Sequence, residues 1–124
     1  MTENEPVILN SDDVEVEKVE KGDEVFIQRL ITDGENAENC FMRRFTMKPG
    51  AFMPSHRHED TDHVQYILNG KMEVNIDGDN RTVKEGDSLY IPVGVPHSYE
   101  NPFDEEIRFL CIVPSGGIET KVLD

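Results

Sequence analysis

The sequence predicts an all-β fold in which short antiparallel strands form a sandwich or a closed barrel. Short runs of β-favouring residues recur along the chain, separated by Gly, Pro, Asn and Asp. Seven Pro and nine Gly are spread over 124 residues, which is typical of a chain with many turns. No window of about 11 or more residues keeps a helical stripe of apolar side chains. The length is that of one domain.

Strands are expected at nine places in the chain. They are predicted over residues 14–19, 25–31, 41–47, 63–68, 71–76, 81–84, 88–91, 97–100 and 107–113. Turn residues separate many of them, at 48–50, 69–70, 77–80, 85–87 and 101–102. Residues 1–12 are expected to form an acidic lead-in, and residues 13–124 a single barrel domain.

Side chains two residues apart on a strand share a face, so the sequence also predicts which of them point inward. The predicted inward sets lie on three strands: Phe41, Arg43, Phe45 and Met47; Met72, Val74 and Ile76; and Ile107, Phe109, Cys111 and Val113. Arg43 is the one charged member of these sets.

The composition is strongly acidic, with 26 Asp and Glu against 12 Lys and Arg and a net charge of −14. Such a surface repels phosphate backbones and anionic lipids, so we expect neither nucleic acid nor a membrane as partner. Two cysteines in a chain of this length do not make a disulfide framework. No apolar run approaches a signal segment or a membrane span. We therefore expect a protein of the reducing cytoplasm.

The four histidines fall in two groups, and both are surrounded by Gly and Pro. His56 and His58 are separated by one residue, His63 begins the next predicted strand, and His97 follows the segment 92–96. Neutral imidazole is a common ligand of transition metals. Any one of these histidines alone is more often a surface or hydrogen-bonded core residue than a ligand. Together they predict a site for one divalent metal ion per chain.

The two groups resemble the two sequence motifs of the cupin superfamily. In the first, G-x5-H-x-H-x3-4-E-x6-G, the matching residues are Gly50, His56, His58 and Gly70. In the second, G-x5-P-x-G-x2-H-x3-N, they are Gly86, Pro92, Gly94, His97 and Asn101. The resemblance implies an antiparallel double-stranded β-helix, the jelly-roll cupin barrel. It carries little information on the reaction, because this fold hosts many activities.

One departure from the first motif concerns the third metal ligand, which is usually Glu. Here the position is His63, six residues before Gly70, with Asp62 as the other candidate if the spacing is shorter. The register from Gly70 favours His63. The chain is thus similar to a subset of small cupins with four histidines that often carry manganese. The resemblance favours Mn or Fe as the ion, with Zn, Ni, Cu and Co possible. It also implies a homodimer, for which Val14, Val16 and Val19 offer an apolar edge.

Four nitrogen ligands leave two positions open on an octahedral ion. The absent Glu removes an obvious general base, which counts against decarboxylation or isomerisation schemes that depend on it. The first hypothesis is a dioxygenase-like oxidoreductase acting on a small organic molecule. The alternatives are a non-redox isomerase or lyase, and a cupin that binds a small ligand without turnover.

Five further side chains are expected to line a pocket over the metal. Strand parity places Gln65 on the face of His63 and Tyr99 on the face of His97. Asn101 shares the face of His97 but is not one of the five. Phe109 and Cys111 belong to the inward face of the last strand, with Arg43 near the mouth. For each, a second interpretation remains open: core packing for Gln65 and Tyr99, a small buried hydrophobe for Cys111, and a structural ion pair for Arg43.

Overall fold

The structure, a computed structural model, describes residues 5–35, 37–56 and 61–114, except for the side chain of His56. Two short 3-10 helices lie at Ser11–Asp13 (η1) and Asp33–Glu35 (η2). The strands are β1 (Glu17–Lys18), β2 (Asp23–Ile31), β3 (Cys40–His56), β4 (His63–Asn69), β5 (Lys71–Ile76), β6 (Asp79–Lys84), β7 (Ser88–Ile91), β8 (His97–Glu100) and β9 (Ile107–Pro114). Each predicted strand has a counterpart among them.

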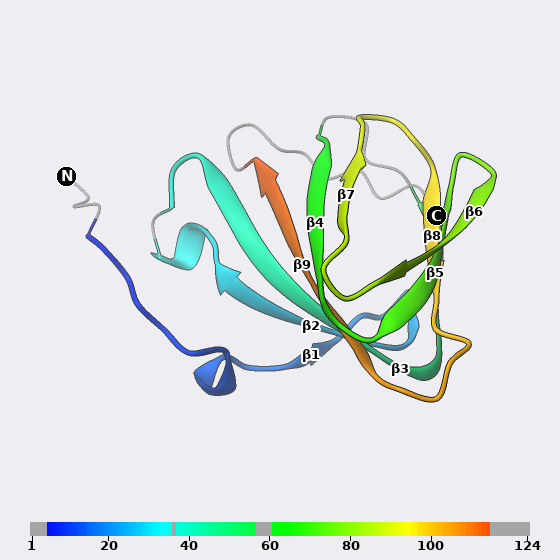
Figure 1. Cartoon of the computed structure of the whole chain (residues 1–124). Helices are drawn as coiled ribbons and strands as arrows, with labels where there is room; N and C mark the ends of the chain where they lie inside the picture. The colour runs from blue at the N-terminus through cyan, green and yellow to red at the C-terminus, as the bar shows by residue number, and fades with distance from the viewer. Residues whose placement is uncertain (1–4, 36, 57–60, 115–124) are drawn as a thin grey trace.

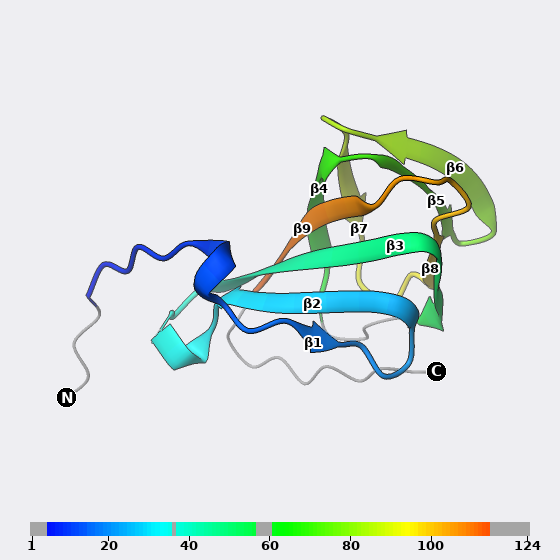
Figure 2. The ribbon, with the colours of Figure 1, turned by 90° about the horizontal axis from the view of Figure 1, so that it is seen from below.

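The strands form one antiparallel sheet that curls on itself into a jelly-roll barrel (Figure 1). The order is β6-β5-β8-β3-β9-β4-β7, and β2 also pairs with β3 and carries β1 on its other edge. Figure 2 shows that β1, β2 and β3 lie side by side, as their pairing requires. The predicted fold class is confirmed.

β3 extends further than predicted, because residues 48–50 do not end it. The strand continues to His56 and bends at Gly50, which has a positive φ of 84°. Its first part pairs with β2 and β9, whereas its last part pairs with β8. A glycine adopts this φ without strain, so the strand can bend from one side of the barrel to the other without stopping. The turn predicted at 48–50 is therefore wrong.

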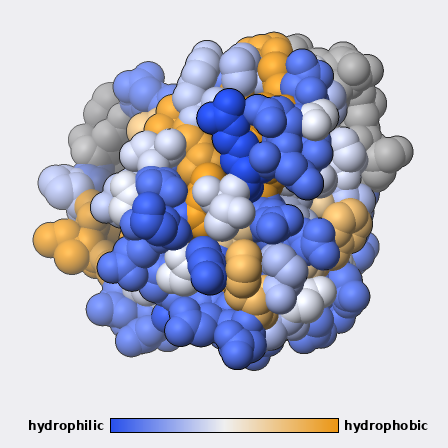
Figure 3. Space-filling view, turned by 45° about the vertical axis from the view of Figure 1, so that its right-hand side comes forward, coloured by the Kyte–Doolittle hydropathy of each residue, from blue (hydrophilic) through white to orange (hydrophobic). Residues whose placement is uncertain are grey.

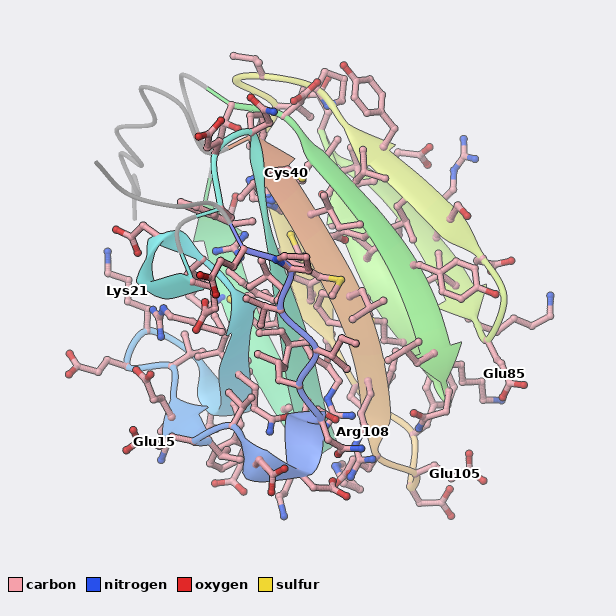
Figure 4. All side chains as sticks on the ribbon, turned by 90° about the vertical axis from the view of Figure 1, so that its left-hand side faces the viewer. Glu15, Lys21, Cys40, Glu85, Glu105 and Arg108 are labelled. Carbon is pink, nitrogen blue, oxygen red and sulfur yellow. The ribbon has the colours of Figure 1, made fainter. Side chains whose placement is uncertain are left out.

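The first strand is shorter than predicted, since only Glu17 and Lys18 pair with β2. The chain before it crosses the outer face of the sheet, where the Gln28 side-chain amide donates hydrogen bonds to the carbonyls of Ser11 and Val14 at 2.6 and 3.0 Å. These bonds to backbone carbonyls hold η1 against the sheet, close to Arg108 (Figure 4). Residues 14–16 therefore belong to this crossing segment and not to a strand.

The core fills the inside of the barrel and contains members of each predicted inward set, whereas Phe41 and Arg43 are only partly buried. Its buried members include Val25, Met47, Ala51, Met53, Ile67, Met72, Val74, Leu89, Ile91, Tyr99, Ile107 and Phe109. Cross-strand pairing places Phe45 opposite Phe109 and Met47 opposite Ile107, as the shared parity predicts. The face drawn in Figure 3 is mostly hydrophilic, in keeping with the composition. No helix within the described ranges is long and apolar enough to cross a membrane.

Gly70 ends β4 at a place where no side chain fits. Its φ is +78°, and a Cβ there would lie 2.7 Å from the backbone oxygen of Glu106. We therefore expect Gly70→Ala to lower the free energy of unfolding by about 2–4 kcal/mol, from backbone strain and a clash with rigid main chain. Urea denaturation measures this loss.

Gly78→Ala is the matched control for this substitution. Gly78 has a φ of +87°, but a Cβ there would have no atom within 4 Å. In this variant the free energy of unfolding should fall only by the cost of the left-handed conformation, about 1 kcal/mol. Equal losses in the two variants would show that the contact with Glu106 is not what excludes a side chain at position 70.

Candidate metal centre

Two of the four predicted metal ligands meet inside the barrel. His63 is the first residue of β4 and His97 the first residue of β8, and their side chains are 4% and 2% exposed. The ring centroids lie 5.8 Å apart with the planes at 60°. The two strands are not neighbours in the sheet, so the curl of the barrel brings these residues together.

The position of His97 is set by the turn before β8. The Nδ1 atom of His97 lies 3.0 Å from the carbonyl oxygen of Val95. A carbonyl only accepts hydrogen bonds, so Nδ1 carries the ring proton and Nε2 carries the lone pair. A backbone carbonyl of this kind is a common outer partner of metal-binding histidines, because it fixes both the tautomer and the ring orientation.

His63, and not Asp62, faces the interior. The Asp62 carboxylate accepts a hydrogen bond from the hydroxyl of Tyr90 at 3.1 Å, and this bond raises the pKa of the exposed Tyr90. The Nδ1 atom of His63 instead lies 3.1 Å from the buried sulfur of Cys111. This geometry supports the register that Gly70 predicted.

The remaining predicted ligands belong to the segment that follows the bend of β3. The backbone register pairs His56 with His97 across β3 and β8. The side chain of His56 and the whole of His58 lie outside the described residues. Among the side chains that are described, no group of three or more potential ligands occurs.

The predicted pocket residues Arg43, Cys111 and Gln65 form one row across β3, β9 and β4. The register pairs Arg43 with Cys111, and Cys111 with Gln65. Arg43 Nη2 lies 3.2 Å from the Cys111 sulfur, and its guanidinium lies over the Phe45 ring at 5.5 Å. Among the described residues no carboxylate pairs with Arg43, and its contacts there are with the Cys111 thiol and the Phe45 ring.

Tyr99 and Phe109 complete the floor beneath the histidines. Gln65 Nε2 donates to the Tyr99 hydroxyl at 2.7 Å, and burial raises the pKa of this hydroxyl far above its usual range. The Tyr99 ring lies 5.6 Å from His97 and 5.5 Å from Phe109, and Phe109 stacks on Phe45 at 5.2 Å. The predicted pocket residues therefore lie together, on an aromatic base that belongs to the core.

Asn101 has a structural role that parity alone did not predict. Although it shares the strand face of His97, its side-chain amide donates to the carbonyls of Met47 and Glu105 at 3.1 and 2.8 Å. Its side-chain oxygen accepts from the backbone nitrogen of Phe103 at 3.1 Å. Completely buried, Asn101 ties the bend of β3 to the loop before β9. It is therefore not a pocket residue.

The donor set fits a transition metal ion. The imidazoles of His63 and His97 are buried and close to each other, and the tautomer of His97 leaves Nε2 able to coordinate. Nitrogen ligands of this kind suit Zn, Cu, Fe and Ni. The sequence did not indicate that Val95 and Cys111 are the partners of the histidines. Every residue has a backbone carbonyl, so Val95 does not stand out. A cysteine in an apolar set is usually a small buried hydrophobic residue.

Comparison with known proteins connects this site to a family, since the cupin domain family matches residues 43–113. The chain is a cupin. Over 110 residues, 89% of its length, this cupin is 27% identical to the polyketide synthase CurC of Streptomyces cyaneus, and the match covers 70% of that protein. It is 42% identical over 50 residues to quercetin 2,3-dioxygenase of Bacillus subtilis, which is 40% of this chain and 15% of that protein.

Similarity to a solved structure extends over nearly the whole cupin. The polyketide cyclase RemF from Streptomyces resistomycificus superposes with a TM-score of 0.84 at 25% sequence identity, covering 97% of this chain and 88% of that one. The shared barrel therefore includes the N-terminal strands as well as the motif region.

Proposed function

We propose that this cupin is a metal-dependent enzyme that acts on a small aromatic or unsaturated molecule, with dioxygenation as the first reaction to test. One divalent ion, Mn or Fe, would be held by His56, His58, His63 and His97. The observation that carries the proposal is the meeting of two buried imidazoles directly above an aromatic floor. The aromatic rings of Tyr99, Phe109 and Phe45 favour a flat, apolar substrate over a sugar.

The chain's own side chains define what the site offers to a substrate. When bound, the ion would supply Lewis acidity and, as Mn or Fe, redox chemistry. Burial raises the pKa of the Tyr99 hydroxyl, so that this group stays protonated beside the proposed site. Gln65 orients that hydroxyl, and the rings of Phe45 and Phe109 exclude water from the floor.

A second candidate, a non-redox reaction of a polyketide-like substrate, is favoured by a separate observation. Two of the relatives matched over most of the chain are named a polyketide synthase and a polyketide cyclase, whereas the match to the dioxygenase covers 50 residues. An aromatic polyketide has the size and unsaturation that the same floor suits. In this reaction the ion would act only as a Lewis acid.

Oxygen uptake separates the two candidates. The purified chain is loaded with Fe(II), Mn(II) or Zn(II) and supplied with quercetin as an aromatic probe. Oxygen consumption in step with product, in the Fe or Mn form and not in the Zn form, is the expected result. Conversion of an aromatic polyketide without oxygen uptake, in the Zn form as well, would contradict dioxygenation and support the non-redox reaction. Tight stoichiometric binding without product would identify a ligand-binding cupin.

We also propose that the protein works as a homodimer, in which the N-terminal arm of each copy covers the other. Residues 5–10 extend away from the barrel (Figures 1 and 2), and Ile8 on this arm is 99% exposed. The outer face of β4, β7 and β9 exposes a continuous set of apolar side chains, Val64, Tyr66, Tyr90 and Ile112. Val19, in contrast, packs against its own core, so it is not available for a partner.

Light scattering tests the dimer at low and high salt. We expect the mass of two chains in both conditions, and of one chain for Ile8→Asp, because a charge on the arm cannot be buried without a partner. Glu15→Gln, also exposed on the N-terminal segment, is the control and should remain dimeric. A wild-type monomer at both salt concentrations contradicts the proposal.

A further inference from the structure

Cys111 lies at the centre of the buried row, and three nitrogen atoms approach its sulfur. Arg43 Nη2, His63 Nδ1 and Gln65 Nε2 lie 3.2, 3.1 and 3.6 Å from Sγ. They come from the two strands on either side of β9. The side chain of Cys111 is 1% exposed, so bulk water does not compete for these contacts.

The chemistry of the neighbours decides the direction of the hydrogen bonds. A guanidinium and the NH2 group of an amide can only donate, so the sulfur accepts from Arg43 and, over the longer distance, from Gln65. The positive charge of Arg43 attracts the electron-rich side of the sulfur. The His63 ring is the one of these three neighbours that can either donate or accept, so its tautomer decides the third contact.

We propose that Cys111, held by Arg43, is a positioning residue for His63: its sulfur accepts a hydrogen bond from Nδ1 and leaves the Nε2 lone pair for the metal ion. His97 shows the same tautomer, with the Val95 carbonyl in the place of the sulfur. This inference rests on the proposed metal centre. Outer partners of this kind change metal affinity by roughly 10–100-fold.

The tautomer of His63 tests the hydrogen bond without any metal. Nitrogen-15 NMR of the metal-free, full-length chain at pH 8 distinguishes a proton on Nδ1 from one on Nε2. We expect His63 to carry it on Nδ1 in the wild type and in Cys111→Ser, which keeps an acceptor. In Cys111→Ala, Nε2–H should appear. A wild-type His63 protonated on Nε2, or a tautomer unchanged in Cys111→Ala, overturns the proposal.

The consequence for the ion is tested by zinc affinity, measured by competition with a chromophoric chelator. Cys111→Ala and Arg43→Met should each bind Zn²⁺ about 10-fold more weakly or worse, whereas Cys111→Ser should stay within about threefold of the wild type.

Val113→Ala is the matched control for lost packing, since Val113 is the next inward residue of β9 and also buried. It should keep the wild-type zinc affinity although it is less stable. If it weakens zinc binding as much as Cys111→Ala does, the effect is general packing and the proposal is wrong. A wild-type chain that binds no zinc contradicts the proposed function, whereas the tautomer result decides the hydrogen bond of Cys111 on its own.

Discussion

His97→Ala is expected to bind a divalent ion more weakly than the wild type by more than about 100-fold, since losing a ligand costs more than losing an outer partner. His97 is 2% exposed, and the Val95 carbonyl fixes the orientation of its ring, so the substitution removes a ligand that is held in place. Elemental analysis of the purified protein and a Zn²⁺ titration measure the loss. His63→Ala should behave in the same way.

Ser98→Ala is the control for His97→Ala, because Ser98 follows it on β8 and alternates to the other face. This variant should keep the metal.

Acidification should release the ion from the wild type, since only neutral imidazole binds a metal. Metal occupancy should be complete above the ordinary His pKa of about 6.5 and should fall below it. Tight binding moves the midpoint to lower pH. Full metal content in His97→Ala would contradict the proposed centre.

The metal that is found should depend on how the protein is produced. Imidazole ligands by themselves prefer copper to manganese. We expect Cu²⁺ to displace Mn²⁺ in a competition titration, although Mn or Fe would be the working ion. Equal apparent affinities for zinc, nickel, manganese and iron would show that the geometry of the site does not select one metal ion over another.

Phe109→Ala is expected to lower the free energy of unfolding by about 3–5 kcal/mol, the usual cost of truncating a buried aromatic side chain. Phe109 is 1% exposed and lies between Phe45 and Tyr99 at centroid distances of 5.2 and 5.5 Å. Chemical denaturation measures the effect. Because the cavity would open under the histidines, the folded fraction should keep its metal and accept larger substrates.

Phe103→Ala is the control for this substitution, since Phe103 is only half-buried and contacts the Lys71 ammonium at 4.5 Å. Its free energy of unfolding should fall by about 1 kcal/mol or less. If Phe109→Ala destabilises the protein but the folded fraction keeps its substrate preference, Phe109 is core packing and does not shape the site. A loss as small as that of Phe103→Ala would contradict the packing itself.

The fold was predictable because period-two patterns and turn residues depend on local chemistry. The parity of Phe45, Phe109 and Cys111 predicted their common inward face, and the pairing of β3 with β9 confirms it. The end of β3 was not predictable in this way. Residues 48–50 have the composition of a turn, yet Gly50 bends the strand and the buried Asn101 holds the bend through the carbonyl of Met47.

The site was predictable only at the level of residue type and spacing. His63 and His97 could be singled out because histidines near Gly and Pro are unusual in an apolar pattern. Their partners could not, since the Val95 carbonyl and the Cys111 sulfur become neighbours only when strands distant in sequence meet. Arg43 shows the same limit: a lone cation in an apolar set suggested either a place at the pocket mouth or an acidic partner, whereas among the described residues it contacts a thiol.

The long β3 strand has a consequence for how fast the protein folds. Its ladders join Met47 to Ile107 and Phe52 to Glu100, so the strand at the middle of the sheet must wait for the C-terminal part of the chain. Folds dominated by such distant pairing reach the native state in roughly milliseconds to seconds, well behind local hairpins such as β5–β6. His63 and His97 can approach each other only after this slow closure. A metal ion would therefore be captured late, by a barrel that is already formed, and would not nucleate it.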